Sequence, residues 1–219
     1  MICNVQRLLW SDSCRILADK FIVMTAISAI ILSGGRATRM GGVDKGLVRL
    51  QQQPFIQYVI DRLKPQVDQI LINANREISQ YQLLGLPVLQ DEQPHFIGPL
   101  AGFSVGLQHC KHAYLLTTPC DSPFIPEDLS SRLLHSLTMQ NAEIAVATSG
   151  GFAHPVFCLM KQSVLPSLTA FIAQGNRKVS LWQKSLAYTE VSFDDCNDAF
   201  VNVNTVEDLE TLALKLIHD

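Results

Sequence analysis

The amino-acid sequence predicts an α/β fold, in which a central sheet is covered by helices. Two observations indicate this class. Apolar runs alternate along the chain with segments whose apolar residues recur at helical spacing. The chain is also long enough for one sizeable core, because its 219 residues are 47% hydrophobic and 17% charged.

Five apolar segments are predicted as strands. Most of them are continuous apolar runs, which is typical of parallel strands that are buried on both faces. The predicted strands are ISAIIL at 27–32, QILIN at 69–73, LPVLQ at 86–90, AYLLTT at 113–118 and EIAVAT at 143–148.

Four amphipathic or capped segments are predicted as helices. The first begins at Pro54 and has apolar residues on one face, and a second begins at Pro99, within the loop sequence HFIGPLAG. The last has Thr205 and Asp208 at the spacing of a capping box. The predicted helices are PFIQYVIDRL at 54–63, PLAGFSVGLQH at 99–109, PEDLSSRLLHSLTMQ at 126–140 and TVEDLETLALKLIH at 205–218.

Residues 27–219 are predicted to form a single domain, and residues 1–26 an extension outside its core. Residues 150–200 have the least regular pattern, so this segment could hold a small subdomain or an active-site lid. The stretch DKFIVMTAISAIIL also resembles the core of a signal peptide, but cleavage would fall near Ser33 to Gly35. It is too short for a bilayer span of about 20 residues. The alternative is a buried strand that follows an extension and an internal Met24.

Net charge indicates which partners to exclude, and cysteine content indicates the cellular compartment to expect. Seventeen Lys and Arg residues against twenty Asp and Glu give a net charge of −3, without a lysine-rich run. No nucleic-acid or membrane partner is therefore expected. The six cysteines form no CxxC pair and have no zinc spacing with the histidines. A reduced, cytoplasmic protein is predicted.

The segment ILSGGRATRMGGVDKG at 31–46 is predicted to be a phosphate-binding loop. It follows a buried strand and so leaves the carboxyl edge of the sheet, where open α/β folds bind ligands. Gly34 and Gly35 permit close backbone approach to an anion, and Arg39 and Lys45 supply positive charge. The segment is neither a G-x-G-x-x-G nor a P-loop motif, and a plain connecting loop is the alternative.

Carboxylates and amides follow three of the predicted strands. Asp121 in TTPCDSP is a candidate Mg²⁺ ligand shared with a nucleoside triphosphate, or else the cap of a local turn. Asn73 and Asp91 could accept hydrogen bonds from guanine, which offers adjacent N–H donors, or could bond locally after their strands. Cys120 is expected to be a small buried hydrophobe rather than a nucleophile.

These segments together resemble a known enzyme family. ILSGGRATRMGGVDKG is similar to the signature of nucleotidyltransferases that activate sugars and cofactors. With NANR at 73–76, GPLAG at 98–102, PCDSP at 119–123 and VNVNT at 201–205, the chain resembles the MobA-like family of molybdenum cofactor guanylyltransferases. The resemblance spans nearly all of residues 27–217. It implies a Rossmann-like, three-layer sandwich of the nucleotide-diphospho-sugar transferase type, with a mostly parallel sheet.

The resemblance also implies substrates and site residues. GTP would be held by Leu32, Ser33, Gly34, Lys45, Asn73, Asp91 and Asp121, together with the glycine backbone at Gly35. Asp121 would bind Mg²⁺, and Arg39, Lys45 and Asp121 would act in catalysis. The acceptor would be molybdopterin, and molybdopterin carriers and molybdoenzyme chaperones would be protein partners.

The pterin-binding residues are less defined by the sequence. The candidates are His154, Arg177, Lys178, Asn202 and Asn204, each of which has a structural alternative as a core histidine, a solvated turn or a helix cap. The predicted activity is GMP transfer from GTP to molybdopterin. The alternatives are a related transferase that uses CTP or a sugar phosphate, and a nucleotide-sensing module without catalytic activity.

Overall fold

The computed structural model describes residues 25–33, 44–50, 53–92 and 98–200. Within them lies a seven-stranded sheet with the strand order β5-β4-β1-β6-β8-β7-β9. β8 pairs antiparallel with β6 and β7, and the other pairings are parallel. A short antiparallel pair, β2 with β3, lies apart from it. The prediction of an α/β fold with a mostly parallel sheet is confirmed.

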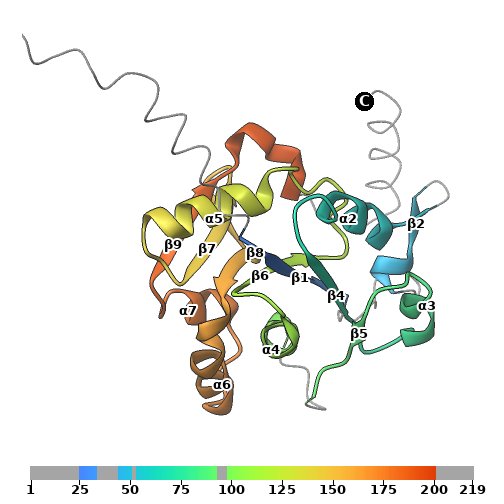
Figure 1. Cartoon of the computed structure of the whole chain (residues 1–219), viewed down its shortest axis with the longest axis horizontal. Coiled ribbons are helices and arrows are strands. Elements are labelled where there is room, and N and C mark those ends of the chain that lie inside the picture. The colour runs from blue at the N-terminus through green and yellow to red at the C-terminus, as the bar shows by residue number, and fades with distance from the viewer. Residues whose placement is uncertain (1–24, 34–43, 51–52, 93–97, 201–219) are drawn as a thin grey trace, which may run out of the picture.

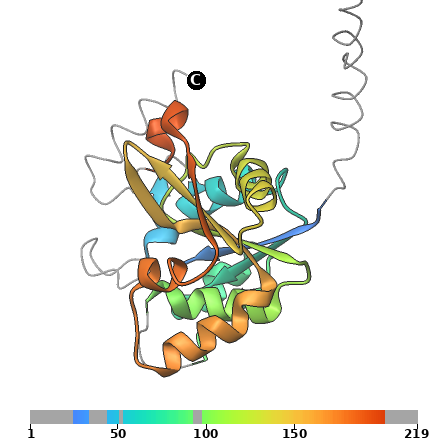
Figure 2. The same ribbon diagram turned by 90° about the vertical axis from the view of Figure 1, so that its left-hand side faces the viewer.

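Helices cover both faces of this sheet (Figure 1). α2 and α5 pack on one face, and α4, α6 and α7 on the other, as the turned view also shows (Figure 2). The strands are β1 Ile27–Leu32, β2 Arg49–Leu50, β3 Gln53–Pro54, β4 Gln69–Asn73, β5 Val88–Leu89, β6 Tyr114–Pro119, β7 Ile144–Ser149, β8 Phe152–Lys161 and β9 Tyr188–Ser192. The α-helices are α2 Phe55–Leu63, α3 Ile78–Gln82, α4 Pro99–His109, α5 Leu129–Met139, α6 Leu165–Ala173 and α7 Val179–Gln183. The 3₁₀ helices are η1 Lys45–Leu47, η2 Gln162–Val164 and η3 Asp194–Phe200.

Sequence patterns explain why these elements form where they do. In α2 the apolar residues at one-face spacing, from Phe55 to Leu63, are all buried, as expected for an amphipathic helix. α4 begins with Pro99 directly after Gly98, whose φ of 67° is a conformation that glycine adopts without strain. α5 begins at Leu129 rather than at Pro126, because the preceding residues form a turn.

The expectation of an irregular subdomain or lid within residues 150–200 is wrong. This segment supplies β8 and β9, which complete the sheet, and helices α6 and α7. β8 pairs with both β6 and β7, so the segment is part of the central core. Its pattern is irregular because Pro155 lies where the pairing register with β7 shifts, and proline cannot donate a ladder hydrogen bond.

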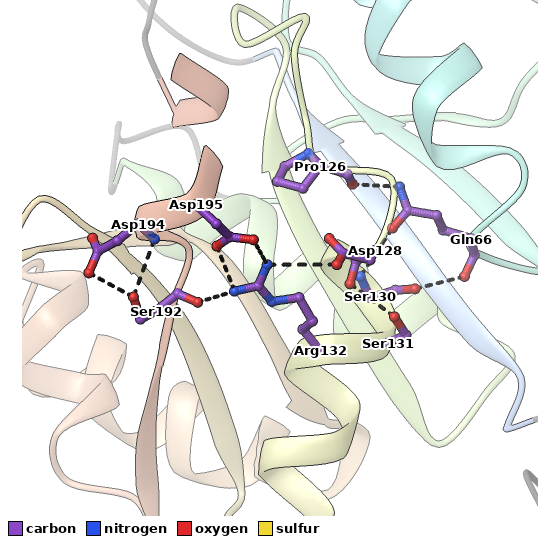
Figure 3. A network of polar contacts seen from close by, with 9 residues as sticks. All are labelled: Gln66, Pro126, Asp128, Ser130, Ser131, Arg132, Ser192, Asp194 and Asp195. Atoms are coloured by element: carbon purple, nitrogen blue, oxygen red, sulfur yellow. Dashed lines mark hydrogen bonds and ion pairs between the residues drawn. The ribbon is translucent and has the colours of Figure 1, made fainter. Parts of the chain in front are cut away.

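A polar network joins helix α5 to the end of β9 and to η3 (Figure 3). The Arg132 guanidinium donates to both carboxylate oxygens of Asp195, at 2.8 and 3.0 Å, and to the carbonyl of Ser192. Its carbon lies 3.9 Å from the centre of the Phe193 ring. Asp194 in turn accepts from the Gly150 amide at the turn between β7 and β8. These contacts hold η3 against the carboxyl end of β7.

None of the helices built from the described residues has the length and apolar character needed to cross a membrane. The four cysteines within those residues are Cys110, Cys120, Cys158 and Cys196, and all four are free thiols. Cys120 is buried, and burial raises the pKa of its thiol, as expected for a packed rather than a nucleophilic cysteine.

Candidate functional site

The candidate site lies at the carboxyl edge of the sheet, where β1, β4 and β6 end side by side. The Ser33 amide donates to the Asn73 carbonyl at 2.8 Å, and the Cys120 amide donates to the Leu32 carbonyl at 3.2 Å. These bonds extend the sheet by one residue beyond each strand. The Ser33 N–H is therefore already used within the protein and is not one of the donors available to a phosphate.

Lys45 and Asp121 form an ion pair at this edge. The Lys45 ammonium lies 3.1 Å from a carboxylate oxygen of Asp121, although 76 positions separate the two residues in the sequence. The Asp121 side chain is 12% exposed and that of Lys45 is 30% exposed, so the pair can still contact a ligand. The structure thus brings together the predicted phosphate-binding cation and the predicted metal ligand.

A buried hydrogen-bonded group surrounds the backbone of Lys45. The carboxylate of Asp44 accepts from the Gly46 amide at 3.3 Å and from the Tyr81 hydroxyl at 2.6 Å. Burial raises the pKa of Asp44, while these two hydrogen bonds oppose that shift by stabilising the charged form. Burial raises the pKa of Tyr81 far above its usual range, so its hydroxyl stays protonated and remains a donor. We call Asp44, Lys45, Gly46, Tyr81 and Asp121 the Lys45 cluster.

A second group of side chains holds the carboxylate of Asp91. One of its oxygens accepts from the Asn73 amide at 2.9 Å, and the other accepts from the Asn75 amide at 2.7 Å. The Asn75 side-chain oxygen also accepts from the Asp91 backbone amide at 2.8 Å. Each carboxylate oxygen retains a second lone pair, so the group can still accept from a ligand. We call Asn73, Asn75 and Asp91 the Asp91 cluster.

Helix α4 approaches this second cluster closely through a glycine. A Cβ at Gly102 would lie 2.4 Å from Leu32 Cδ2 and 2.6 Å from the side-chain oxygen of Asn73. Any larger residue would have to displace one of these side chains. Gly102 belongs to the segment GPLAG, and this close contact gives a physical reason for the glycine there.

Several predicted site residues lie outside the described residues. Gly34, Gly35 and Arg39 fall in 34–43, and Asn202 and Asn204 fall in 201–219. Their roles in binding phosphate or pterin stay predictions from the sequence. The same holds for the predicted helix at 205–218 and for the extension at 1–26, apart from Thr25 and Ala26.

The remaining pterin candidates make contacts within the protein. His154 stacks on Phe200 with ring centres 4.6 Å apart, and its Nε2 lies 2.7 Å from the Ser149 hydroxyl. Arg177 donates to the carbonyls of Ile172 and Asn176, at 3.1 and 2.7 Å, and so closes the end of α6. Lys178 is exposed and precedes α7. These contacts agree with the structural alternatives for His154 and Arg177.

Four residues of the site were not singled out from the sequence. For two of them a signal existed. Asn75 follows Asn73 by two positions, the period at which side chains of an extended chain face the same side, and Asp44 precedes a tight turn as a capping residue does. Gly102 lies in the quoted segment GPLAG, but its contact with Asn73 could not be read from that segment. Tyr81 offered no signal, because its contact with Asp44 joins residues 37 positions apart.

The donor set fits a magnesium ion that is shared with a nucleotide. Among the described residues, no three His, Cys, Asp or Glu side chains gather closely enough to hold a metal ion by themselves. Mg²⁺ commonly binds through one or two carboxylates, with water and substrate phosphates completing its six ligands. The single, nearly buried carboxylate of Asp121 meets that requirement.

The sequence and the fold both match known proteins. Residues 29–187 match the family described as the MobA-like NTP transferase domain. A protein of Polynucleobacter asymbioticus named molybdenum cofactor guanylyltransferase is 51% identical over 194 residues, which cover 87% of this chain and 97% of that protein. One of the same name from Shewanella putrefaciens is 48% identical over 188 residues, with coverages of 86% and 96%.

A solved structure supports the assignment of the fold. Molybdopterin-guanine dinucleotide biosynthesis protein A from Archaeoglobus fulgidus superposes with a TM-score of 0.73 at 20% identity, and the match covers 88% of this chain and all of that one. The family match spans the strands that carry both the Lys45 and the Asp91 clusters, and about half of the residues aligned with the first relative are identical. The chain therefore belongs to the family of MobA-like NTP transferases.

Proposed function

We propose that this chain transfers GMP from GTP to the terminal phosphate of Mo-molybdopterin, forming molybdopterin guanine dinucleotide and releasing pyrophosphate. The observation that carries the proposal is the ion pair of Lys45, the last cation of the predicted phosphate-binding segment 31–46, with Asp121 at the end of β6. The names of the relatives from Polynucleobacter and Shewanella, which share about half of the aligned residues, support the same reaction.

The reaction requires positioning and charge stabilisation more than proton transfer. The attacking group is a phosphate, which is already anionic near neutral pH, so no general base is needed at the nucleophile. The α-phosphorus of GTP would be attacked in line as pyrophosphate leaves. The Lys45 ammonium is suited to stabilise the charge that develops on the leaving pyrophosphate, and Arg39 is proposed to act with it. A Mg²⁺ ion held by Asp121 would supply further charge stabilisation.

The Asp91 cluster is proposed to select guanine. Guanine presents N1–H and N2–H₂ as adjacent donors, which two carboxylate oxygens can accept together. Asn73 and Asn75 hold one oxygen each and so fix the plane of the Asp91 carboxylate. Neither adenine nor cytosine presents the same pair of adjacent donors. A base without that pair would leave a partly buried carboxylate incompletely bonded, which costs affinity.

The proposed reaction is tested by measuring pyrophosphate release from GTP, CTP, ATP and UTP, each with and without Mo-molybdopterin. We expect release with GTP only when the acceptor is present, together with formation of the guanine dinucleotide. Equal or faster release of pyrophosphate with CTP would show that the enzyme transfers CMP rather than GMP. Tight GTP binding without any release would indicate a nucleotide-sensing module.

Asp121→Asn tests the metal-binding role within that assay. The amide keeps the shape of the side chain but loses the charge, so we expect turnover to fall about a hundredfold or more and to require higher Mg²⁺ concentrations. Asp61→Asn is the matched control, because Asp61 forms a surface ion pair with Lys64 at 3.6 Å. Unchanged turnover of Asp121→Asn at limiting Mg²⁺ would show that Asp121 does not bind the metal ion.

A further inference from the structure

Lys45 is carried by a very short element. η1 consists of Lys45–Leu47, and its backbone bonds within the turn run from the Leu47 amide to the Asp44 carbonyl at 3.0 Å and from the Val48 amide to the Lys45 carbonyl at 3.2 Å. A single turn of 3₁₀ helix has little stability of its own. Contacts from outside the turn must therefore hold Lys45 in place.

The Asp44 side chain connects the turn to such a contact, and it also caps the turn by accepting from the Gly46 amide. This carboxylate is only 5% exposed. A buried carboxylate needs several donors to offset the loss of water, and a 3.3 Å bond from one amide is weak. The 2.6 Å bond from the Tyr81 hydroxyl is much shorter, and the donor comes from helix α3, outside the turn.

Packing leaves these groups little freedom. A Cβ built on Gly46 would lie 2.6 Å from the Tyr81 hydroxyl oxygen and 3.2 Å from Cys120 Cβ. The backbone of the turn is thus enclosed between the fully buried Tyr81 on one side and Cys120 on the other. Cys120 directly precedes Asp121, the partner of Lys45. One continuous set of contacts therefore runs from α3, through the turn, to the end of β6.

We infer that Tyr81 and Asp44 are positioning residues, whose buried hydrogen bond holds the turn at 44–48 so that the Lys45 ammonium lies at Asp121. Tyr81 itself is fully buried and acts only through Asp44 and the backbone of the turn. The consequence for turnover rests on the proposed transfer of GMP. The consequence for the stability of the turn does not depend on any reaction.

Tyr81→Phe tests the inference first without reference to activity. The change removes one hydroxyl and keeps the ring that fills the core. We expect the amides of Gly46, Leu47 and Val48 to exchange hydrogen about tenfold faster, because the cap loses its strongest donor. Tyr188→Phe is the matched control, since it removes a 2.8 Å Tyr–carboxylate bond to Glu190 on β9. Exchange in Tyr81→Phe that stays within twofold of the parent chain would overturn the inference.

The second readout is steady-state GMP transfer. For Tyr81→Phe we expect kcat to fall about tenfold while KM for GTP changes less than threefold, because the variant misplaces a group that acts mainly in the transition state. Tyr188→Phe should match the parent chain. An unchanged kcat for Tyr81→Phe, or a loss explained wholly by a smaller folded fraction, would contradict a positioning role. If the parent chain transfers no GMP, the proposed function fails, and the exchange measurement alone decides the inference.

Asp44→Asn provides an independent check in the same assays. The asparagine oxygen can still accept from Tyr81 and Gly46, but a neutral amide oxygen is a weaker acceptor than a carboxylate oxygen. We therefore expect Tyr81→Phe to change exchange and kcat less when it is added to Asp44→Asn than when it is made in the parent chain. Full additivity of the two substitutions would show that the residues act separately and would overturn the inference.

Discussion

At the scale of single residues, Lys45 is predicted to contribute more to catalysis than to the binding of GTP in the ground state. Its ammonium contacts the Asp121 carboxylate, so the phosphates of a bound GTP would compete with that carboxylate for the same cation. The charge that develops on pyrophosphate in the transition state adds attraction that the ground state lacks. We therefore expect Lys45→Ala to lower kcat by more than it weakens GTP affinity, at about tenfold per 1.4 kcal/mol of lost stabilisation.

Calorimetric binding of GTP and steady-state kinetics check this prediction. Lys64→Ala serves as the control, because it removes a lysine from an exposed ion pair with Asp61 on the end of α2. A Lys45→Ala variant that loses affinity and kcat equally would show that Lys45 contributes to binding alone.

Asn75 gives a second prediction at this scale, directed at the choice of base. Asn75→Ala removes the bonds to both the carboxylate and the backbone amide of Asp91, at 2.7 and 2.8 Å. The orientation of the Asp91 carboxylate is then fixed only by its bond from Asn73. We expect kcat/KM for GTP to fall about tenfold and the ratio of GTP to ATP use to decrease, whereas turnover of saturating GTP stays closer to the parent value.

Competition between GTP and ATP in one reaction measures that ratio directly. Asn176→Ala is a suitable control, since the Asn176 amide makes only a 3.4 Å side-chain contact at an exposed turn. An unchanged base preference in Asn75→Ala would mean either that Asp91 does not bind guanine or that Asn73 alone fixes the orientation of the Asp91 carboxylate.

The position of a residue at the carboxyl edge of the sheet could be predicted from the sequence where that residue ends or closely follows a strand. Asn73 ends β4, and Asp121 follows β6 within two positions, so the topology alone brought both to the carboxyl edge. Such prediction failed for Tyr81, whose role depends on how α3 packs against a turn 37 positions earlier. Spacing along the chain carries no information about such a contact.

At the scale of elements, the β7–β8 hairpin contains a histidine that couples folding to pH. Burial lowers the pKa of His154 below its ordinary value of 6.5. The unfolded chain therefore binds a proton more readily than the folded chain, and the free energy of unfolding should decrease as the pH falls below about 6.5. We expect this decrease to be smaller in His154→Gln, since glutamine carries no charge at any pH.

Chemical denaturation at pH 7.5, 6.5 and 5.5 tests this dependence. The quantity to compare is the slope of stability with pH, because replacing the ring also removes its stacking on Phe200 at every pH. Equal slopes for His154→Gln and the parent chain would assign the acid sensitivity to other groups.

Element prediction was accurate where one periodicity persisted over a whole segment. The continuous apolar run of β1 and the one-face pattern of α2 both predicted the elements that are observed. The sequence indicates an apolar strand only after Pro155, and the first residues of β8 were missed because they are exposed and because His154 and Pro155 interrupt the apolar run. β5 was predicted too long, since only Val88 and Leu89 pair with β4 at the edge of the sheet.

At the scale of the whole molecule, the sequence predicts that the core does not require residues 1–23. We expect a chain that starts at Met24 to keep the melting temperature and kcat of the parent chain, because β1 begins only at Ile27. Differential scanning calorimetry and the transfer assay on both chains measure this. A melting temperature several degrees lower would show that the preceding residues contribute to packing, at roughly 1 kcal/mol per 2–4 °C for a domain of this size.

The strand order also determines how the chain must be assembled during synthesis. Ile30 in the central strand pairs with Leu71 on one side and with Thr117 on the other, and both partners are made long after it. At about 5–20 residues per second, the two edges of this apolar strand stay unpaired on the ribosome for several seconds. Open apolar edges are templates for association between chains. The position of β1 between β4 and β6 thus leaves both of its apolar edges open during synthesis until those later strands have been made.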